Sequence, residues 1–107
     1  MKRPKVIQAI KTILHQVAPD ATVILYGSEA RGNARYDSDI DLLILIDKEK
    51  ITHQDITNIT YPLYDLEASF DYQINISPLV YNRQQWHNRP FQTPFYINVM
   101  NEGQKLQ

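Results

Sequence analysis

The feature that most constrains this chain is an apolar run that opens with two carboxylates at alternate positions. Residues 39–47 read DIDLLILID, so only Leu and Ile separate Asp41 from Asp47. Such a run is typical of a strand in the middle of a sheet. Because side chains alternate between the faces of a strand, Asp39 and Asp41 project together. The two carboxylates repel one another, which favours a site where a divalent cation such as Mg²⁺ lies between them.

The turn before this run has the residues of a phosphate-binding site. Residues 22–26 (TVILY) read as a short buried strand, and Gly27 and Ser28 follow it directly. A glycine here lets backbone N–H groups approach an anion closely, and the Ser28 hydroxyl can donate to a phosphate oxygen. Arg31 and Arg35 follow and can neutralise or orient phosphates.

Each of these pieces has an ordinary explanation when it stands alone. A strand followed by Gly-Ser and a helix is common, and an Asp-x-Asp pair at a strand start is more often a solvated edge or a cap. Isolated arginines are usually surface charges. The combination is far more specific: Gly27-Ser28, then the ten residues 29–38, then two carboxylates that lead straight into an apolar strand.

The remaining pattern predicts an α/β fold with a small sheet of three or four strands. Apolar residues recur at helical spacing over 4–17, and again after Thr52, which is the expected N-cap of a helix that Pro62 kinks or shortens. Alternation over 69–81 predicts a third strand. Two helices are expected after it: a short one around Trp86 with Asn82 as N-cap, and a last one from Thr93-Pro94 to Gly103.

Length and composition exclude several classes of protein. With 107 residues, a single domain over 1–107 is expected. The absence of cysteine excludes disulfides, thiolate zinc sites and a cysteine nucleophile. A net charge of −1 argues against a general nucleic-acid-binding surface. The sequence has no signal-peptide pattern and no run near the roughly 20 apolar residues of a membrane span, so a cytoplasmic protein is expected.

The stretch GSEARGNARYDSDIDLLIL (27–45) closely resembles the signature of the DNA polymerase β-like nucleotidyltransferase superfamily. The short chain and the Ala-Arg-Gly form of the motif resemble its minimal nucleotidyltransferase (MNT) group. The resemblance implies a small mixed β-sheet flanked by helices. It also implies transfer of a nucleoside monophosphate from an NTP, by family default ATP, to a hydroxyl, with release of pyrophosphate.

The resemblance assigns roles to the motif residues. Gly27 and Ser28 would hold the β- and γ-phosphates, and Arg31 and Ser38 would also contact the nucleotide. The carboxylates of the Asp-x-Asp pair would bind two Mg²⁺ ions, the usual device for in-line nucleotidyl transfer.

Members of this superfamily usually carry a third catalytic carboxylate on a neighbouring strand. Asp71, in the strand expected over 69–81, is the match, and it would complete the metal site. Strand alternation would put it on one polar face with Gln73 and Asn75. Glu67 is the second candidate, although it falls on the preceding helix pattern. The alternative for Asp71 is an ordinary strand-end residue that faces water.

Two tyrosines lie close to the motif. Tyr26 or Tyr36 could stack on a base or a ribose, although ordinary packing is the commoner role of a half-buried tyrosine.

The acceptor is not encoded in any motif. The chain is too short for the extra helical domain that larger relatives use, so the acceptor is expected to be small or to come from a partner. MNT proteins are typically encoded beside a helical HEPN-domain protein. The implied function is that of an antitoxin which adenylylates a tyrosine of a HEPN toxin. The alternatives are a binding module that neutralises a partner without chemistry, and transfer to a small molecule such as an aminoglycoside; self-association is left open.

Overall fold

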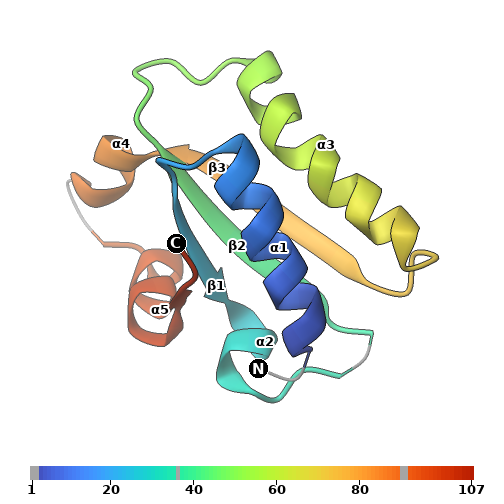
Figure 1. Ribbon diagram of the computed structural model, residues 1–107. Helices are drawn as coiled ribbons and strands as arrows, with labels where there is room; N and C mark the ends of the chain where they lie inside the picture. The colour runs from blue at the N-terminus through green and yellow to red at the C-terminus, as the bar shows by residue number, and fades with distance from the viewer. Residues whose placement is uncertain (1–2, 36, 90–91) are drawn as a thin grey trace.

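A four-stranded sheet with helices on both of its faces makes up the part of the chain that the structure, a computed structural model, describes: residues 3–35, 37–89 and 92–107 (Figure 1). Tyr36 lies outside these residues. In chain order the elements are α1 Pro4–Val17, β1 Thr22–Tyr26, α2 Gly27–Arg31, β2 Asp39–Ile46, α3 His53–Ser69, β3 Asn75–Asn82, α4 Arg83–His87, α5 Pro94–Glu102 and β4 Gln104–Lys105.

The sheet is mixed and has the strand order β3-β2-β1-β4. β2 pairs antiparallel with β1 and parallel with β3, and β4 adds an antiparallel edge to β1. β2 therefore has a partner on each side, which explains why its sequence is apolar on both faces. The predicted small mixed sheet flanked by helices is confirmed.

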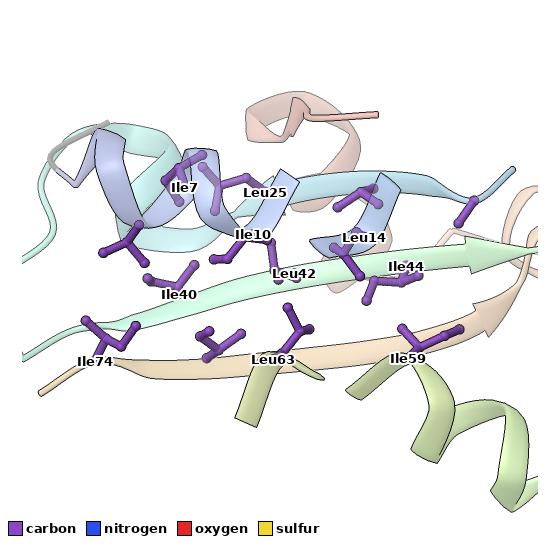
Figure 2. Close-up of a cluster of buried hydrophobic side chains, with 14 of the residues drawn as sticks. Ile7, Ile10, Leu14, Leu25, Ile40, Leu42, Ile44, Ile59, Leu63 and Ile74 are labelled. Carbon is purple, nitrogen blue, oxygen red and sulfur yellow. The ribbon is translucent and has the colours of Figure 1, made fainter. Parts of the chain in front are cut away.

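One face of the sheet carries the larger core. The alternate residues Ile40, Leu42 and Ile44 of β2 are fully buried beneath α1 and α3. Figure 2 shows their side chains gathered with Ile10 of α1 and Leu63 of α3. Truncating one of these residues to alanine typically costs about 2–5 kcal/mol. This packing fixes the strand that carries the two carboxylates.

The other face is covered by α4 and α5 only over part of its length. Leu43 and Leu45 of β2 pack there with Trp86 of α4 and Val99 of α5. Asp39 and Asp41 belong to the same face by alternation, toward the start of the strand. The carboxylates thus lie beside a small apolar cluster and are anchored by a strand that is buried beyond them.

The predicted N-caps are confirmed. Thr52 forms a capping box with Asp55 at the start of α3, and the side chains of Asn82 and Thr93 accept backbone N–H bonds at the starts of α4 and α5. Pro62 does not shorten α3, which runs as one helix of 17 residues.

One expectation about the strands was wrong. The third strand does not start at residue 69, because α3 continues to Ser69 and a turn follows it. In that turn Asp71 and Tyr72 have left-handed backbones, and their N–H groups donate to the carbonyls of Ala68 and Glu67. The fourth strand, β4, agrees with the expected sheet of three or four strands, although no residue pattern gave its position. It forms because the chain after α5 pairs its backbone with β1.

Candidate active site

Asp39 and Asp41 project from the same face at the start of β2. Asp39 is exposed and Asp41 is half-buried. Burial raises the pKa of Asp41 above its usual value, the charge of Asp39 raises it further, and the charge of Arg31 opposes the rise. The predicted pair of neighbouring, mutually repelling carboxylates is therefore present.

Gly27 brings the turn after β1 against these carboxylates. Its φ is +76°, a left-handed conformation that favours glycine, and a Cβ at this position would overlap Asp41 Oδ2 and lie 3.3 Å from Asp41 Cγ. The turn can approach the carboxylate only because residue 27 has no side chain. Gly27 and Asp41, 14 positions apart in the sequence, thus form one compact unit.

Ser28 and Arg31 lie on α2, which directly follows Gly27. Ser28 is half-buried, and its carbonyl oxygen accepts the N–H of Asn33. The positive charge of Arg31 partly offsets the rise in the pKa of Asp41. The guanidinium itself forms an ion pair with Glu102 of α5 at 3.1 Å, and both side chains are more than 40% exposed. Such an exposed pair is weak, so the Arg31 guanidinium can turn to an anionic ligand at small cost.

Ser38 shapes the loop that enters β2. Its hydroxyl oxygen accepts the N–H of Arg35 at 2.9 Å, and its carbonyl oxygen accepts a bond from the Arg3 guanidinium at 2.8 Å. These bonds set the position of Asp39, the next residue. A contact between Ser38 and the nucleotide stays a prediction.

A buried ion pair, for which the sequence carries no local signal, supports the same region. Glu29 of α2 is fully buried, and its Oε1 accepts a bond from Arg3 Nε at 2.7 Å. A glutamate in a short helical turn normally faces water, and the ion pair with the distant Arg3 offsets the cost of burying this one. Arg3 thereby links the start of α1, the turn after β1 and the entry to β2.

Asp71 does not join the two carboxylates. It lies in the turn after α3, before β3 begins, and the described residues contain no group of three or more His, Asp or Glu side chains that could hold a metal ion. The predicted position of Asp71 on a strand was therefore wrong, and its role as third metal ligand stays a prediction. The physical reason is that the turn and not a strand forms over residues 70–73, so alternation cannot carry Asp71 onto the site face.

Glu67, the second candidate, is engaged elsewhere. Its Oε2 accepts a hydrogen bond from the backbone N–H of Ile76 at 2.7 Å. This bond gives a partner to a backbone donor of β3. The residues that β3 places beside the carboxylates are instead neutral: Asn75 pairs with Asp39, and Ser77 pairs with Asp41.

Tyr26 lies on the other side of Asp41. It is the register partner of Asp41 on β1, and its ring meets Phe95 of α5 edge to face at 5.5 Å between centroids. Burial, then the charge of Asp41, then Tyr81, raise the pKa of Tyr26 to about 12. Tyr26 is thus a neutral, packed phenol beside the carboxylate, which is the commoner role expected from the sequence.

The donor set at this face fits a hard divalent cation. Two carboxylates share this face, one with a pKa raised by burial and then by the charge of the other, and the backbone of a glycine turn packs against it. Carboxylate oxygens, completed by water and phosphate oxygens, are the ligands that Mg²⁺ prefers. Asp39 and Asp41 are the residues that would hold the ion.

Three comparisons relate this chain to known proteins. The model of a family described as "Nucleotidyltransferase domain" matches residues 7–105. A protein of Haemophilus influenzae, described as a probable protein adenylyltransferase MntA, is 50% identical over 36 residues, which is 34% of this chain and 32% of that protein. A crystal structure of a toxin–antitoxin with AMP-PNP matches with a TM-score of 0.59 and 20% identity, over 94% of this chain and 72% of that chain.

No helix of the described residues has the length and apolar character needed to cross a membrane.

Proposed function

This chain belongs to the nucleotidyltransferase domain family, and we propose that it is of the MNT type and transfers AMP from ATP to a hydroxyl group in a Mg²⁺-dependent reaction. One observation carries the proposal: Asp39 and Asp41 share a face, and a glycine turn is packed directly against the second of them. This arrangement joins a cation site to a backbone that can approach phosphates.

Each motif residue has a task in the proposed reaction. Asp39 and Asp41 hold Mg²⁺, which when bound offsets charge on the phosphates. Gly27 and Ser28 bind the β- and γ-phosphates, and Arg31 leaves its exposed ion pair to contact the nucleotide. The acceptor oxygen forms a bond to the α-phosphorus, the bond from that phosphorus to the bridging oxygen of the β-phosphate breaks, pyrophosphate leaves, and the hydroxyl proton passes to solvent.

The proposed acceptor is a tyrosine of a partner toxin of the helical HEPN class, which makes this chain the antitoxin. Three observations support it. The H. influenzae relative is described as a protein adenylyltransferase, although the aligned part covers only about a third of that protein, and the structural relative is a toxin–antitoxin. The site face is also open at Asp39, which leaves room for a large acceptor. The pair would act in the cytoplasm, where ATP and Mg²⁺ are available.

Label transfer tests this proposal. The chain and the helical protein encoded beside it are incubated with α-labelled ATP and Mg²⁺, and the products are resolved by gel and intact mass. An AMP-sized gain on the neighbour, lost in Asp41→Ala, is expected. Asp65→Ala is the matched control, because it removes an exposed carboxylate on α3, away from the site face. Equal transfer by Asp41→Ala and the wild type would reject the assignment.

A second candidate function is a nucleotide-binding module that neutralises its partner without transfer. The observation that favours it is the absence of a third carboxylate beside Asp39 and Asp41 among the described residues. In the same experiment, this function would give a stable complex of the two proteins and retained ATP, but no label on either chain.

A further inference from the structure

We infer that this domain by itself holds a single divalent cation at Asp39 and Asp41, the ion that accompanies the nucleotide, because β3 offers Ser77 and Asn75 where a second ion needs a carboxylate. The inference rests on the proposed function and concerns how the same site is built. It replaces the two-ion expectation that the sequence motif suggests.

The register of the sheet places two neutral side chains beside the carboxylates. β2 and β3 run parallel, with Asp39 opposite Asn75 and Asp41 opposite Ser77. Residues paired across neighbouring strands point to the same face, and the strands are about 4.8 Å apart. An acidic residue on β3 that shared a metal with the pair would have to stand at one of these two positions. Both are occupied by side chains without charge.

The opposite flank is neutral as well. On β1 the register partner of Asp41 is Tyr26, whose phenol is an uncharged group at neutral pH. β1 ends at Tyr26, so it places no further residue beside Asp39. Asp41 therefore has an uncharged register partner on each neighbouring strand, Tyr26 on β1 and Ser77 on β3.

The acidic residues that shortly precede β2 and β3 in the sequence lie elsewhere. Glu67 extends from α3, which covers the opposite face of the sheet, and is bonded to the backbone of β3. Asp71 is exposed in the turn before β3. Asp37, in the loop before β2, lines a surface hollow with Arg3 and Asn75. Among the described residues neither these nor any other acid or histidine completes a metal-binding group of three with the pair.

Charge decides how many ions such a site holds. Two carboxylates carry a charge of −2, which balances one Mg²⁺ or Mn²⁺. A second ion would rest on the neutral oxygens of Ser77 and Asn75 and on the phosphates alone. Mg²⁺ dehydrates reluctantly and depends on carboxylates together with substrate phosphates, so this second position is expected to stay weak. A single new carboxylate at Ser77, directly beside Asp41, should be enough to create it.

Counting bound Mn²⁺ tests the inference without relying on turnover. The purified chain is titrated with Mn²⁺ in the presence of AMP-PNP, free Mn²⁺ is measured by electron paramagnetic resonance, and nucleotide binding is measured by calorimetry. We expect one bound Mn²⁺ per chain for the wild type and two for Ser77→Asp. Leu79→Asp is the matched control: it adds the same charge on the same strand and face, opposite Leu43 and away from the carboxylates, and should bind one. Thermal unfolding checks that both variants are folded.

The outcomes separate this inference from the proposed function. Two Mn²⁺ bound by the wild type would overturn the inference while leaving the function intact. One Mn²⁺ in both the wild type and a folded Ser77→Asp would overturn the claim that Ser77 marks the missing position. A wild type that binds neither Mn²⁺ nor AMP-PNP would instead reject the proposed function. Calorimetry identifies this outcome, because it measures nucleotide binding separately from the Mn²⁺ count.

Discussion

Gly27 and Asp41 face one another so closely that a methyl group on Gly27 would overlap Asp41 Oδ2. The left-handed φ of Gly27 adds a cost of about 1–2 kcal/mol for any residue with a side chain. We therefore expect Gly27→Ala to lower the free energy of unfolding by more than this amount and to abolish nucleotide binding. Urea denaturation and calorimetry with Mg²⁺ and ATP measure the two effects.

Gly32 provides the control for that substitution. It has a similar φ of +79°, but a Cβ there would meet nothing within 4 Å. Gly32→Ala should show the backbone cost alone and keep its affinity for nucleotide. An equal loss of affinity in both variants would mean that the packing of Gly27 against Asp41 is not what builds the site.

Asp41 is expected to weaken the metal-free fold at neutral pH. Its pKa is raised by burial and by Asp39, so the folded chain binds this proton more tightly than the unfolded chain. Stability then falls as pH rises through the raised pKa, and the penalty is fully present at neutral pH. In EDTA, Asp41→Asn should melt above the wild type at pH 7, and the difference should shrink as the pH is lowered toward about 4. A wild type that melts higher at pH 7 would contradict this.

The site could be predicted from the sequence where its geometry follows from local rules. The two-residue period of a strand is enough to predict that Asp39 and Asp41 share a face. The turn at Gly27 is predicted because the apolar strand before it ends at Tyr26. Helix starts at Thr52, Asn82 and Thr93 were equally local, because a capping side chain bonds a backbone group two or three residues away.

The rest depends on contacts between distant residues. Polar and apolar residues alternate from Phe70 to Ile74 as in a strand, but backbone bonds from the end of α3 close a turn there instead. The register that puts Ser77 beside Asp41 depends on where β3 begins, which no local pattern states. The burial of Glu29 likewise depends on a partner 26 positions away.

Asp55 makes the start of α3 sensitive to acid. A hydrogen bond from Lys48 and bonds from Thr52 lower its pKa to about 2, below its usual value. The folded state therefore favours the ionised form, and this stabilisation is present above about pH 4 and lost as pH falls through about 2. Wild type and Asp55→Asn, compared by thermal melting, should differ at pH 5 and converge near pH 2. A constant difference across this range would exclude the linkage.

The buried pair of Arg3 and Glu29 should matter more than an exposed ion pair. Arg3→Ala leaves the fully buried Glu29 carboxylate without its guanidinium, and breaking a buried pair in this way costs about 3–5 kcal/mol. Urea denaturation should show a loss of that size. The matched control is Arg31→Ala, which breaks the exposed pair with Glu102 and should cost no more than about 1 kcal/mol.

The double variant Arg3→Met/Glu29→Leu separates charge from packing. It removes both charges and fills the space with apolar side chains, so much of the stability lost in Arg3→Ala should return. The bond from Arg3 to the Ser38 carbonyl stays absent in this double variant, and that bond positions the entry to β2. We therefore expect recovered stability with weaker binding of Mg²⁺ and ATP. Full recovery of both would show that the pair stabilises the fold without helping to place Asp39.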